Sequence, residues 1–294
     1  MTAFHQVGVV GAGLMGAGIA QVSAVAGYPT IVRDVNDDVL ARARRTIEQS
    51  LAKFVEKQKL TTEAAAAAWG RLTFTTDPQA FRSTDLVIEA VTEDLAIKLR
   101  LWAELDQSCP LAAVFASNTS SLPIGAQATA TTRPDRFVGL HFFSPVPLMP
   151  LVEVVRAAGT SDETFDRAMA WVKSLGKEAI AAGDTPGFIV NRLLIPYLME
   201  AIRALERGVG AVTDLDLGMK LGAGHPMGPL TLADMVGLDV CLRVADIMFA
   251  EFHEPQYAPP PLLRRLVTDG LLGRKTGRGF YDYSVNPPTP MDRA

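Results

Sequence analysis

Short hydrophobic runs alternate with longer amphipathic stretches through the first 182 residues of the chain. Runs rich in Val, Ile and Phe predict strands, whereas apolar positions spaced three and four residues apart predict helices. We expect strands at 6–10, 29–33, 72–75, 85–91, 113–117, 137–143, 151–156 and 178–182, and helices at 14–26, 37–58, 62–69, 94–107 and 162–175. Strands that alternate with helices indicate a mostly parallel sheet covered on both faces, which is an α/β architecture.

The pattern changes after a cluster of helix and strand breakers at residues 182–187. Beyond this cluster we expect helices near 188–208, 213–221, 229–252 and 261–269, and no strand. The proline-rich residues 254–261 predict an exposed loop, and residues 286–290 predict a frayed tail. The chain is therefore predicted to fold as an α/β domain at residues 1–184, followed by an all-α domain at residues 185–294.

Composition and charge narrow the class of protein. With 48% hydrophobic and 20% charged residues among 294, the chain is predicted to be globular rather than disordered or fibrous. Its formal net charge of −4 provides no general attraction to nucleic acid or to an anionic membrane, so neither is expected as a partner. The chain has no continuous apolar run long enough for a membrane span, and its first residues lack a secretory pattern. We therefore expect a cytoplasmic protein.

The cysteines and histidines indicate neither a disulfide framework nor a metal site. Cys109 and Cys241 have no C-x-x-C spacing, and we expect both to be buried small hydrophobic side chains in a reducing compartment. The four histidines show no paired spacing, so no metal is expected.

A glycine-rich turn follows the first predicted strand and opens the first predicted helix. It has the pattern G-x-G-x-x-G and consists of Gly11, Ala12, Gly13, Leu14, Met15 and Gly16. The first glycine permits a tight turn, the second lets the backbone approach a pyrophosphate, and the third lets the helix pack on the strand. The turn therefore predicts a Rossmann-type domain that binds a dinucleotide at the start of a helix. The alternative is a tight turn without a ligand.

Asp34 directly follows the second predicted strand, where the dinucleotide fingerprint calls for an acidic residue. Its carboxylate would accept hydrogen bonds from the adenosine ribose hydroxyls and would repel a 2′-phosphate. The residue therefore favours NAD over NADP. Arg33 beside it weakens that preference, and a helix N-cap is the alternative role for Asp34.

Several polar residues lie at or near the ends of later predicted strands, and one carboxylate lies within an apolar strand. Residues 117–121 contain four hydroxyls and Asn118, at the edge where open α/β sheets bind ligands. His141 ends another strand. Glu153 lies within the apolar strand 151–156, where a carboxylate is costly to bury without a partner. A His–Glu pair would orient the imidazole and make His141 a general base, whereas a core histidine is the alternative.

Taken together, these segments and several later ones resemble the L-3-hydroxyacyl-CoA dehydrogenases, most closely the short bacterial 3-hydroxybutyryl-CoA dehydrogenases. The resemblance runs over nearly the whole chain and is carried by segments 11–16, 116–122, 141–143, 150–154, 186–192, 225–230 and 273–281. It implies an NAD-binding Rossmann domain and a helical domain for substrate binding and homodimer formation. The implied reaction is the reversible oxidation of a short (S)-3-hydroxyacyl-CoA to the 3-oxoacyl-CoA.

The resemblance also implies roles for individual residues. His141 is similar to the general base of the family and Glu153 to its orienting partner. Ser120 resembles the serine that binds the reacting oxygen, and Asn191 the asparagine that positions the substrate. Besides the glycine-rich turn and Asp34, the implied cofactor contacts are Glu93, Lys98, Asn118, Ser120, Ser144 and Lys275. The implied coenzyme A contacts are Ser50 and Lys57, for which a solvated helix face is the alternative.

One position departs from the family pattern. The family usually reads His-Phe-Phe-Asn-Pro, and Ser144 stands where that asparagine would approach the nicotinamide. A serine hydroxyl lacks the reach of an amide and its separate donor and acceptor groups. The resemblance therefore implies a weaker hold on the nicotinamide carboxamide.

Three other functions stay open on the sequence alone. A 3-hydroxyadipyl-CoA dehydrogenase would need a cation near the end of the acyl chain, and an enzyme similar to L-gulonate dehydrogenase would not need a helix that binds coenzyme A. A non-catalytic NAD-binding protein, similar to the crystallin relatives of this family, would keep the fold without the activity. The joint presence of Ser120, His141, Glu153 and Asn191 argues against the third.

Overall fold

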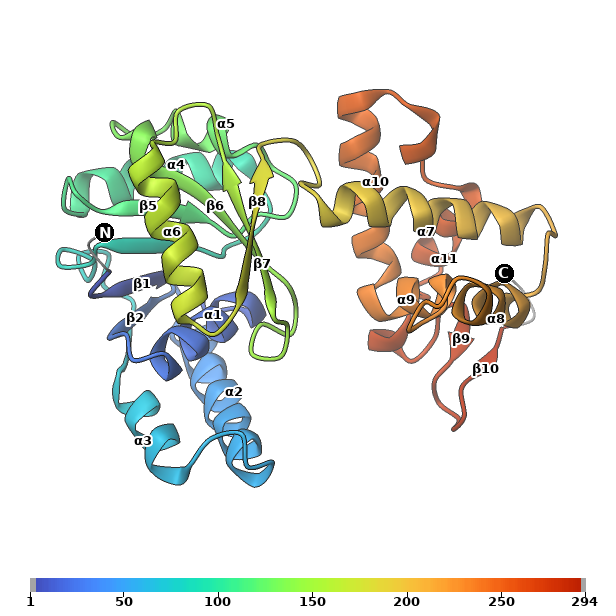
Figure 1. The fold of residues 1–294 in the computed structure, drawn as a ribbon, viewed down its shortest axis with the longest axis horizontal. Coiled ribbons are helices and arrows are strands. Elements are labelled where there is room, and N and C mark those ends of the chain that lie inside the picture. Colours follow the sequence, from blue (N-terminus) through green and yellow to red (C-terminus); the bar gives the residue numbers. More distant parts are fainter. Residues whose placement is uncertain (1–3, 292–294) are drawn as a thin grey trace. The chain divides into compact units, whose positions relative to one another are not determined.

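Two compact units make up the chain in the computed structural model, Met1–Thr185 and Pro186–Ala294 (Figure 1). The structure describes residues 4–291, so the predicted domain ends at residues 1 and 294 lie outside the described residues. Each unit has its own hydrophobic core. The predicted fold class, an α/β domain followed by a helical one, is confirmed.

The first unit is built around one eight-stranded sheet with the strand order β3-β2-β1-β4-β5-β6-β7-β8. Its strands are β1 (Val7–Val10), β2 (Thr30–Arg33), β3 (Leu72–Thr75), β4 (Leu86–Glu89), β5 (Val114–Ser117), β6 (Phe137–Phe142), β7 (Leu151–Arg156) and β8 (Glu178–Gly183). All neighbouring strands are parallel except β6 and β7, which run antiparallel. Every residue of the central strands β1, β4, β5 and β6 is buried, as expected for strands covered on both faces.

Alternate residues of these strands meet two different layers of helices. On one face, strand residues such as Val9 and Leu140 share a core with α1 (Leu14–Val25), α2 (Asp37–Glu56) and α6 (Asp162–Ser174), and α3 (Thr62–Gly70) packs on α1. On the other face, Trp102 of α4 (Leu95–Ser108) packs on Phe137, with ring centroids 4.7 Å apart, and α5 (Ile124–Ala128) lies against α4. Because side chains alternate along β6, His141 shares the face of Phe137.

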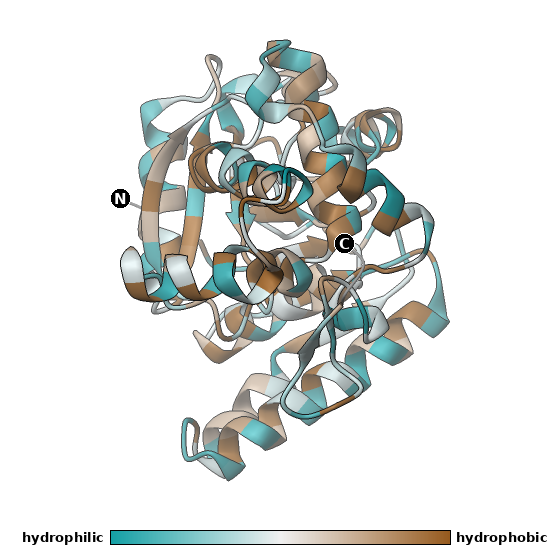
Figure 2. Cartoon of the chain, turned by 90° about the vertical axis from the view of Figure 1, so that its right-hand side faces the viewer, coloured by the Kyte–Doolittle hydropathy of each residue, from teal (hydrophilic) through white to brown (hydrophobic). Residues whose placement is uncertain are grey.

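The second unit is a set of helices around a separate core. The helices are α7 (Val190–Glu206), α8 (Val212–Gly222), α9 (Pro229–Val236), α10 (Leu238–Phe252) and α11 (Pro261–Thr268). Buried residues of these helices, mostly Leu, Ile, Val, Met and Ala, form the core together with Phe280. Figure 2 shows hydrophobic and hydrophilic residues interspersed along the helices of both units, and the long helices α2 and α7 bury apolar residues such as Leu40 and Leu198.

Three sequence expectations for the second unit are wrong. The helix expected at 229–252 is interrupted at Gly237, where a φ of +102° ends α9 before α10 begins. The expected absence of strands is contradicted by the antiparallel pair β9 (Tyr281–Asp282) and β10 (Thr289–Pro290), which replaces the frayed tail at 286–290. The expected loop at 254–261 includes a short helix, η2 (Pro255–Tyr257), with Tyr257 buried. Two-residue strands and single helical turns are too short to show a hydrophobic period, so whether they form depends on their contacts with the core.

Cys109 and Cys241 are free thiols and both are buried, as expected. Burial raises the pKa of Cys109 to about 11, so it is a neutral thiol at physiological pH. Among residues 4–291, the helices are too short or too polar to cross a lipid bilayer.

Candidate active site

The glycines of the turn between β1 and α1 meet different steric limits. Gly11 has a φ of +92°, and a Cβ there would lie 2.6 Å from the carbonyl oxygen of Ala90. A Cβ at Gly16 would lie 1.7 Å from the carbonyl oxygen of Gly11, so only glycine lets α1 start this close to the turn. A Cβ at Gly13 would meet no atom within 4 Å. The start of α1 has no acidic residue and no side-chain cap, so its N–H groups can receive an anion in this open space.

Asp34 holds the glycine-rich turn against the end of β2. Its Oδ2 accepts a hydrogen bond from the backbone N–H of Ala12 at 2.8 Å. The side chain that caps α2 is Asn36, not Asp34. Asp34 is half-buried and lines a pocket of about 310 Å³. Because carboxylate oxygens have several lone pairs, Asp34 can hold the turn and still accept a hydrogen bond from a ribose hydroxyl in this pocket.

His141 and Glu153 face each other across the antiparallel strands β6 and β7. His141 Nδ1 lies 2.6 Å from Glu153 Oε2, and Glu153 is fully buried while His141 is 6% exposed. An ionised carboxylate only accepts hydrogen bonds, so Nδ1 carries the hydrogen and Nε2 is the nitrogen that can take up a proton. The geometry suits a general acid–base whose ring is oriented by a carboxylate.

Residues 118–122 form a loop after β5 that Glu93 holds in place. Glu93 Oε1 accepts hydrogen bonds from the Thr119 hydroxyl at 2.5 Å and from the Ser120 backbone N–H at 3.0 Å. Asn118 Oδ1 accepts a hydrogen bond from the backbone N–H of Phe142 at 3.0 Å. The structure therefore brings Glu93 to the loop that carries Ser120, and Asn118 of the same loop to Phe142, the residue after His141 in β6.

A buried lysine joins this loop to the sheet. Lys98, 1% exposed, lies 2.5 Å from Glu89 Oε1 and 3.2 Å from Glu93 Oε2. Burial alone would raise the pKa of Glu93, but Lys98 and the hydrogen bonds from Thr119 and Ser120 hold that pKa below its ordinary value. Glu93 is therefore a carboxylate at neutral pH and keeps its acceptor oxygens for the loop.

Sequence reasoning missed Glu89, which also accepts a hydrogen bond from the Ser117 hydroxyl at 2.6 Å. The signal was present, because Glu89 ends the apolar strand β4 just as Glu153 lies within apolar β7. A buried carboxylate in a hydrophobic strand predicts a buried partner. For Glu89 that partner is Lys98, nine residues further along the chain.

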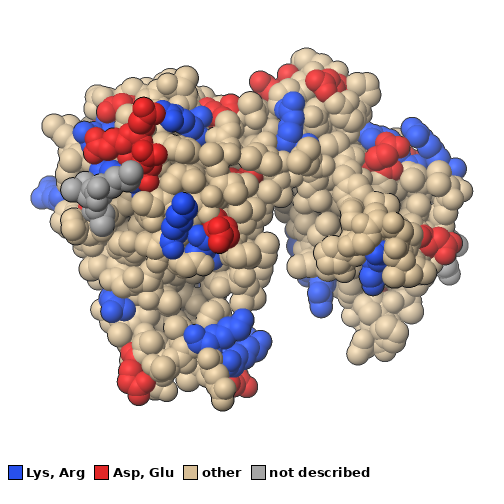
Figure 3. Space-filling model, in the orientation of Figure 1, with Lys and Arg blue, Asp and Glu red and all other residues tan. Residues whose placement is uncertain are grey.

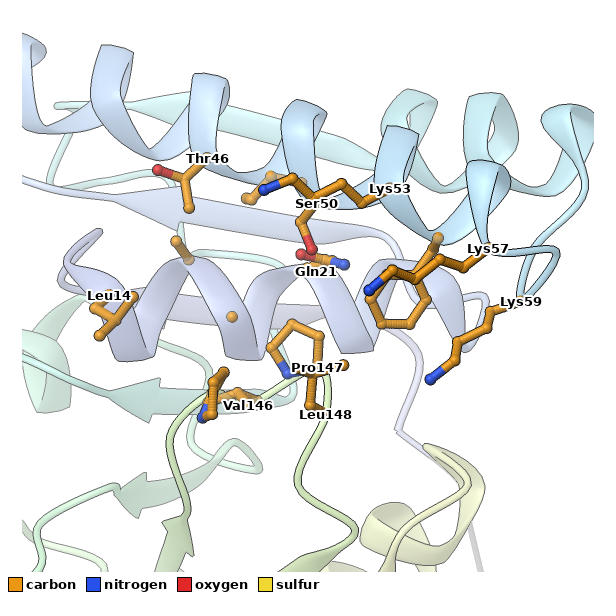
Figure 4. A pocket seen from close by; sticks show the side chains of 15 residues that line it. Leu14, Gln21, Thr46, Ser50, Lys53, Lys57, Lys59, Val146, Pro147 and Leu148 are labelled. Atoms are coloured by element: carbon orange, nitrogen blue, oxygen red, sulfur yellow. The ribbon is translucent and has the colours of Figure 1, made fainter. Parts of the chain in front are cut away.

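Ser50 and Lys57 line a second pocket of about 220 Å³, formed by α1, α2 and the loop after β6 (Figure 4). Sequence reasoning did not assign Lys59 or the loop residues 145–148 to this site. Lys57 and Lys59 lie at one end of the pocket and Lys53 lies over Ser50, and Figure 3 shows basic side chains gathered over the end of α2. Other walls are apolar and include Leu14, Val146 and Pro147. A basic end with apolar walls suits a long ligand that carries phosphates at one end.

Ser144 is exposed in the loop between β6 and β7. This loop is anchored by Lys177, whose buried ammonium group donates to the carbonyl oxygens of Val146 at 2.7 Å and Met149 at 2.6 Å. Burial lowers the pKa of Lys177 from its ordinary value. The loop contains Ser144 and lines the second pocket, and Lys177 connects it to the start of β8.

Two predicted site residues belong to the second unit. Asn191 lies in the first turn of α7 and is half-buried. Lys275 lies in the short helix η3 (Arg274–Thr276), where its Nζ is 2.5 Å from Asp239 Oδ1. His225, which we interpret as structural, has its Nδ1 3.0 Å from the Tyr197 hydroxyl.

Each unit matches a domain model of a known protein family. Residues 6–185 match the model of the 3-hydroxyacyl-CoA dehydrogenase NAD binding domain, and residues 187–283 match the model of the 3-hydroxyacyl-CoA dehydrogenase C-terminal domain.

Individual proteins are similar over nearly their whole length. The chain is 49% identical over 276 residues to a probable 3-hydroxybutyryl-CoA dehydrogenase of Deinococcus radiodurans, covering 94% of this chain and 99% of that one. It is 48% identical to the human mitochondrial hydroxyacyl-coenzyme A dehydrogenase, covering 94% of this chain and 90% of that one. The crystal structure of (S)-3-hydroxybutyryl-CoA dehydrogenase PaaH1 from Ralstonia eutropha is 44% identical, with a TM-score of 0.92, and covers 96% of this chain and 100% of that one.

Proposed function

The chain belongs to the 3-hydroxyacyl-CoA dehydrogenase family, and we propose that it is an NAD-dependent oxidoreductase that interconverts (S)-3-hydroxyacyl-CoA and 3-oxoacyl-CoA. We propose a short acyl chain, with 3-hydroxybutyryl-CoA and acetoacetyl-CoA as the pair, because similar proteins carry that substrate in their names. The observation that carries the mechanism is the His141–Glu153 contact on the sheet that also bears the dinucleotide-binding turn.

The first unit fits NAD at the residues that would hold it. The open space at Gly13 and the uncapped start of α1 would receive the pyrophosphate, and Asp34 would bind the adenosine ribose. Around the nicotinamide end, we propose contacts from Glu93, Lys98, Asn118, Ser120, Ser144 and Lys275. When bound, NAD accepts a hydride from C3 of the substrate during oxidation.

His141 takes the proton of the substrate 3-hydroxyl at Nε2 in the oxidative direction. Its Nδ1–H remains hydrogen-bonded to Glu153, which keeps the ring oriented and stabilises the imidazolium. In the reductive direction His141 returns the proton to the 3-oxygen. Because Glu153 is fully buried, its charge acts on the imidazole with little screening by water.

Ser120 binds the 3-oxygen through its hydroxyl, where negative charge develops in the transition state. The hydrogen bonds from its loop to Glu93 place the residue at the carboxyl end of β5. We propose that Asn191 helps to position the substrate through its side-chain amide. The coenzyme A portion is proposed to occupy the pocket lined by Ser50 and Lys57, with phosphates at its basic end.

The test is NADH oxidation with acetoacetyl-CoA, compared with NADPH and with free acetoacetate. Rapid turnover that requires both NADH and the thioester is expected. Faster turnover of 3-hydroxyadipyl-CoA or of L-gulonate would replace the proposed substrate with that compound. NADH binding without turnover of any of these substrates would show a non-catalytic binding protein.

Replacing Asp34 tests the basis of cofactor choice. In Asp34→Ala we expect the preference for NADH over NADPH, measured as the ratio of kcat/KM values, to fall about tenfold, because one carboxylate that binds ribose and repels phosphate is lost. Asp34→Asn is the matched variant, since its amide oxygen can still accept the Ala12 N–H. A ratio unchanged in both variants would mean that another residue sets the preference.

We also propose a homodimer, as the family resemblance implies, and a cytoplasmic location. Light scattering coupled to size-exclusion chromatography is expected to give twice the chain mass of 31.6 kDa. A monomer at micromolar concentration would remove the dimer from the proposal.

A further inference from the structure

Four charged residues line the pocket that contains Asp34. Arg33 ends β2 and Asp34 follows it, while Arg100 and Glu104 come from α4. On α4 the lining residues are Ile97, Arg100, Leu101 and Glu104, spaced as one helical face. Under the proposed function this pocket receives the adenosine ribose, so its charges surround the position where NADP carries a 2′-phosphate and NAD a hydroxyl.

Arg33 is a buried cation that is only partly used by the protein. The residue is 7% exposed, and its Nη2 lies 2.9 Å from Glu104 Oε1. Within the described residues its Nε is buried without a hydrogen-bond partner. A guanidinium has five N–H donors in a planar fork that matches a phosphate. Arg33 therefore has donors left that Glu104 does not satisfy.

We propose that Glu104 helps set the choice between NAD and NADP by neutralising Arg33. A phosphomonoester carries close to two negative charges at neutral pH, so both Asp34 and Glu104 repel it. With Glu104 ionised, the pocket holds two cations and two carboxylates. Without that charge, Arg33 and Arg100 outnumber Asp34 and favour a 2′-phosphate. Cofactor choice then depends on a charge balance that includes α4, not on Asp34 alone.

The geometry gives Glu104 a role that is separable from folding. Its side chain is 47% exposed, so replacing it with glutamine buries no new polar group, and Arg33 loses only the negative charge of its partner. Glutamine keeps the size of the side chain and a hydrogen-bond acceptor for Arg33 while removing the negative charge. The change in cofactor affinity therefore reports the charge.

The experiment measures the dissociation constants of NADH and NADPH by isothermal titration calorimetry, at low and high salt. In Glu104→Gln we expect the ratio of the two constants to shift about tenfold toward NADPH at low salt, and less at high salt. In the double variant Glu104→Gln with Arg33→Met the shift is expected to disappear. Glu48→Gln, an exposed helix residue outside both pockets, removes the same net charge and should leave the ratio unchanged.

The inference rests on the proposed NAD-dependent function, and the titrations separate the two. No NADH binding by the unmodified protein would overturn the proposed function. Normal NADH binding with an unchanged ratio in Glu104→Gln would overturn only the role of Glu104. A shift that persists without Arg33, or that Glu48→Gln reproduces, would also overturn it.

Discussion

His141→Ala is expected to lower kcat by about 10²- to 10⁴-fold, the contribution typical of a positioned general base. The substitution removes an imidazole that a fully buried carboxylate orients. Binding of NADH is expected to change little, because the glycine-rich turn and Asp34 are untouched. Stopped-flow measurement of acetoacetyl-CoA reduction gives the rate, and protein fluorescence gives the NADH affinity.

Two further variants test whether the loss of kcat is specific to the His141–Glu153 pair. Glu153→Gln keeps the size of the side chain but removes the charge that stabilises the imidazolium, so kcat is expected to fall while the fold remains. His5→Ala removes an exposed histidine and should leave kcat unchanged. Equal turnover by His141→Ala and the unmodified enzyme would show that the proton passes through another group.

Lys98→Met is expected to lower the free energy of unfolding by about 3–5 kcal/mol, the usual cost of breaking a buried ion pair by removing one partner. The substitution leaves Glu89, fully buried, and Glu93, largely buried, without their cation. The loop that carries Ser120 loses support at the same time, because Glu93 holds it. Urea denaturation followed by circular dichroism measures the loss.

The sign of the pH dependence gives an independent check. In the unmodified protein the lowered pKa of Glu93 adds stability that is present above the ordinary glutamate range and is lost as pH falls through the folded value. Without Lys98, only the hydrogen bonds from Thr119 and Ser120 oppose the effect of burial, so the pKa of Glu93 rises and the variant loses less stability in acid. The difference in unfolding free energy should therefore narrow from pH 7 toward about pH 4.5.

Lys173→Met is the matched control for this prediction. Lys173 is an exposed lysine of α6, and its replacement should change the unfolding free energy by less than about 0.5 kcal/mol. If Lys98→Met were no more destabilising than this control, the Glu89–Lys98–Glu93 network would contribute nothing to the stability of the fold.

The local sequence was sufficient for the eight strands and the longer helices of the first unit, but it did not predict the short helix α5. The predicted strands 72–75 and 151–156 have the same bounds as β3 and β7, and the glycine-rich turn lies between β1 and α1 as predicted. These features depend on neighbours a few residues apart, through hydrophobic period and glycine sterics. Gly237 was a local signal of a helix break that the hydrophobic period around it outweighed, whereas the β9–β10 pair has no local signal, so sequence reasoning missed both.

Only the tertiary structure decided which distant residues meet. The sequence offered His141 and Glu153 as a pair, but the antiparallel register of β6 and β7 brings their side chains to 2.6 Å. The order of strands in the sheet likewise brings Glu89 to Ser117, and helix packing brings Arg33 to Glu104 and residues 145–148 to Lys57. Hydrophobic period encodes which face of an element is buried, whereas strand order and register arise from packing the whole core at once.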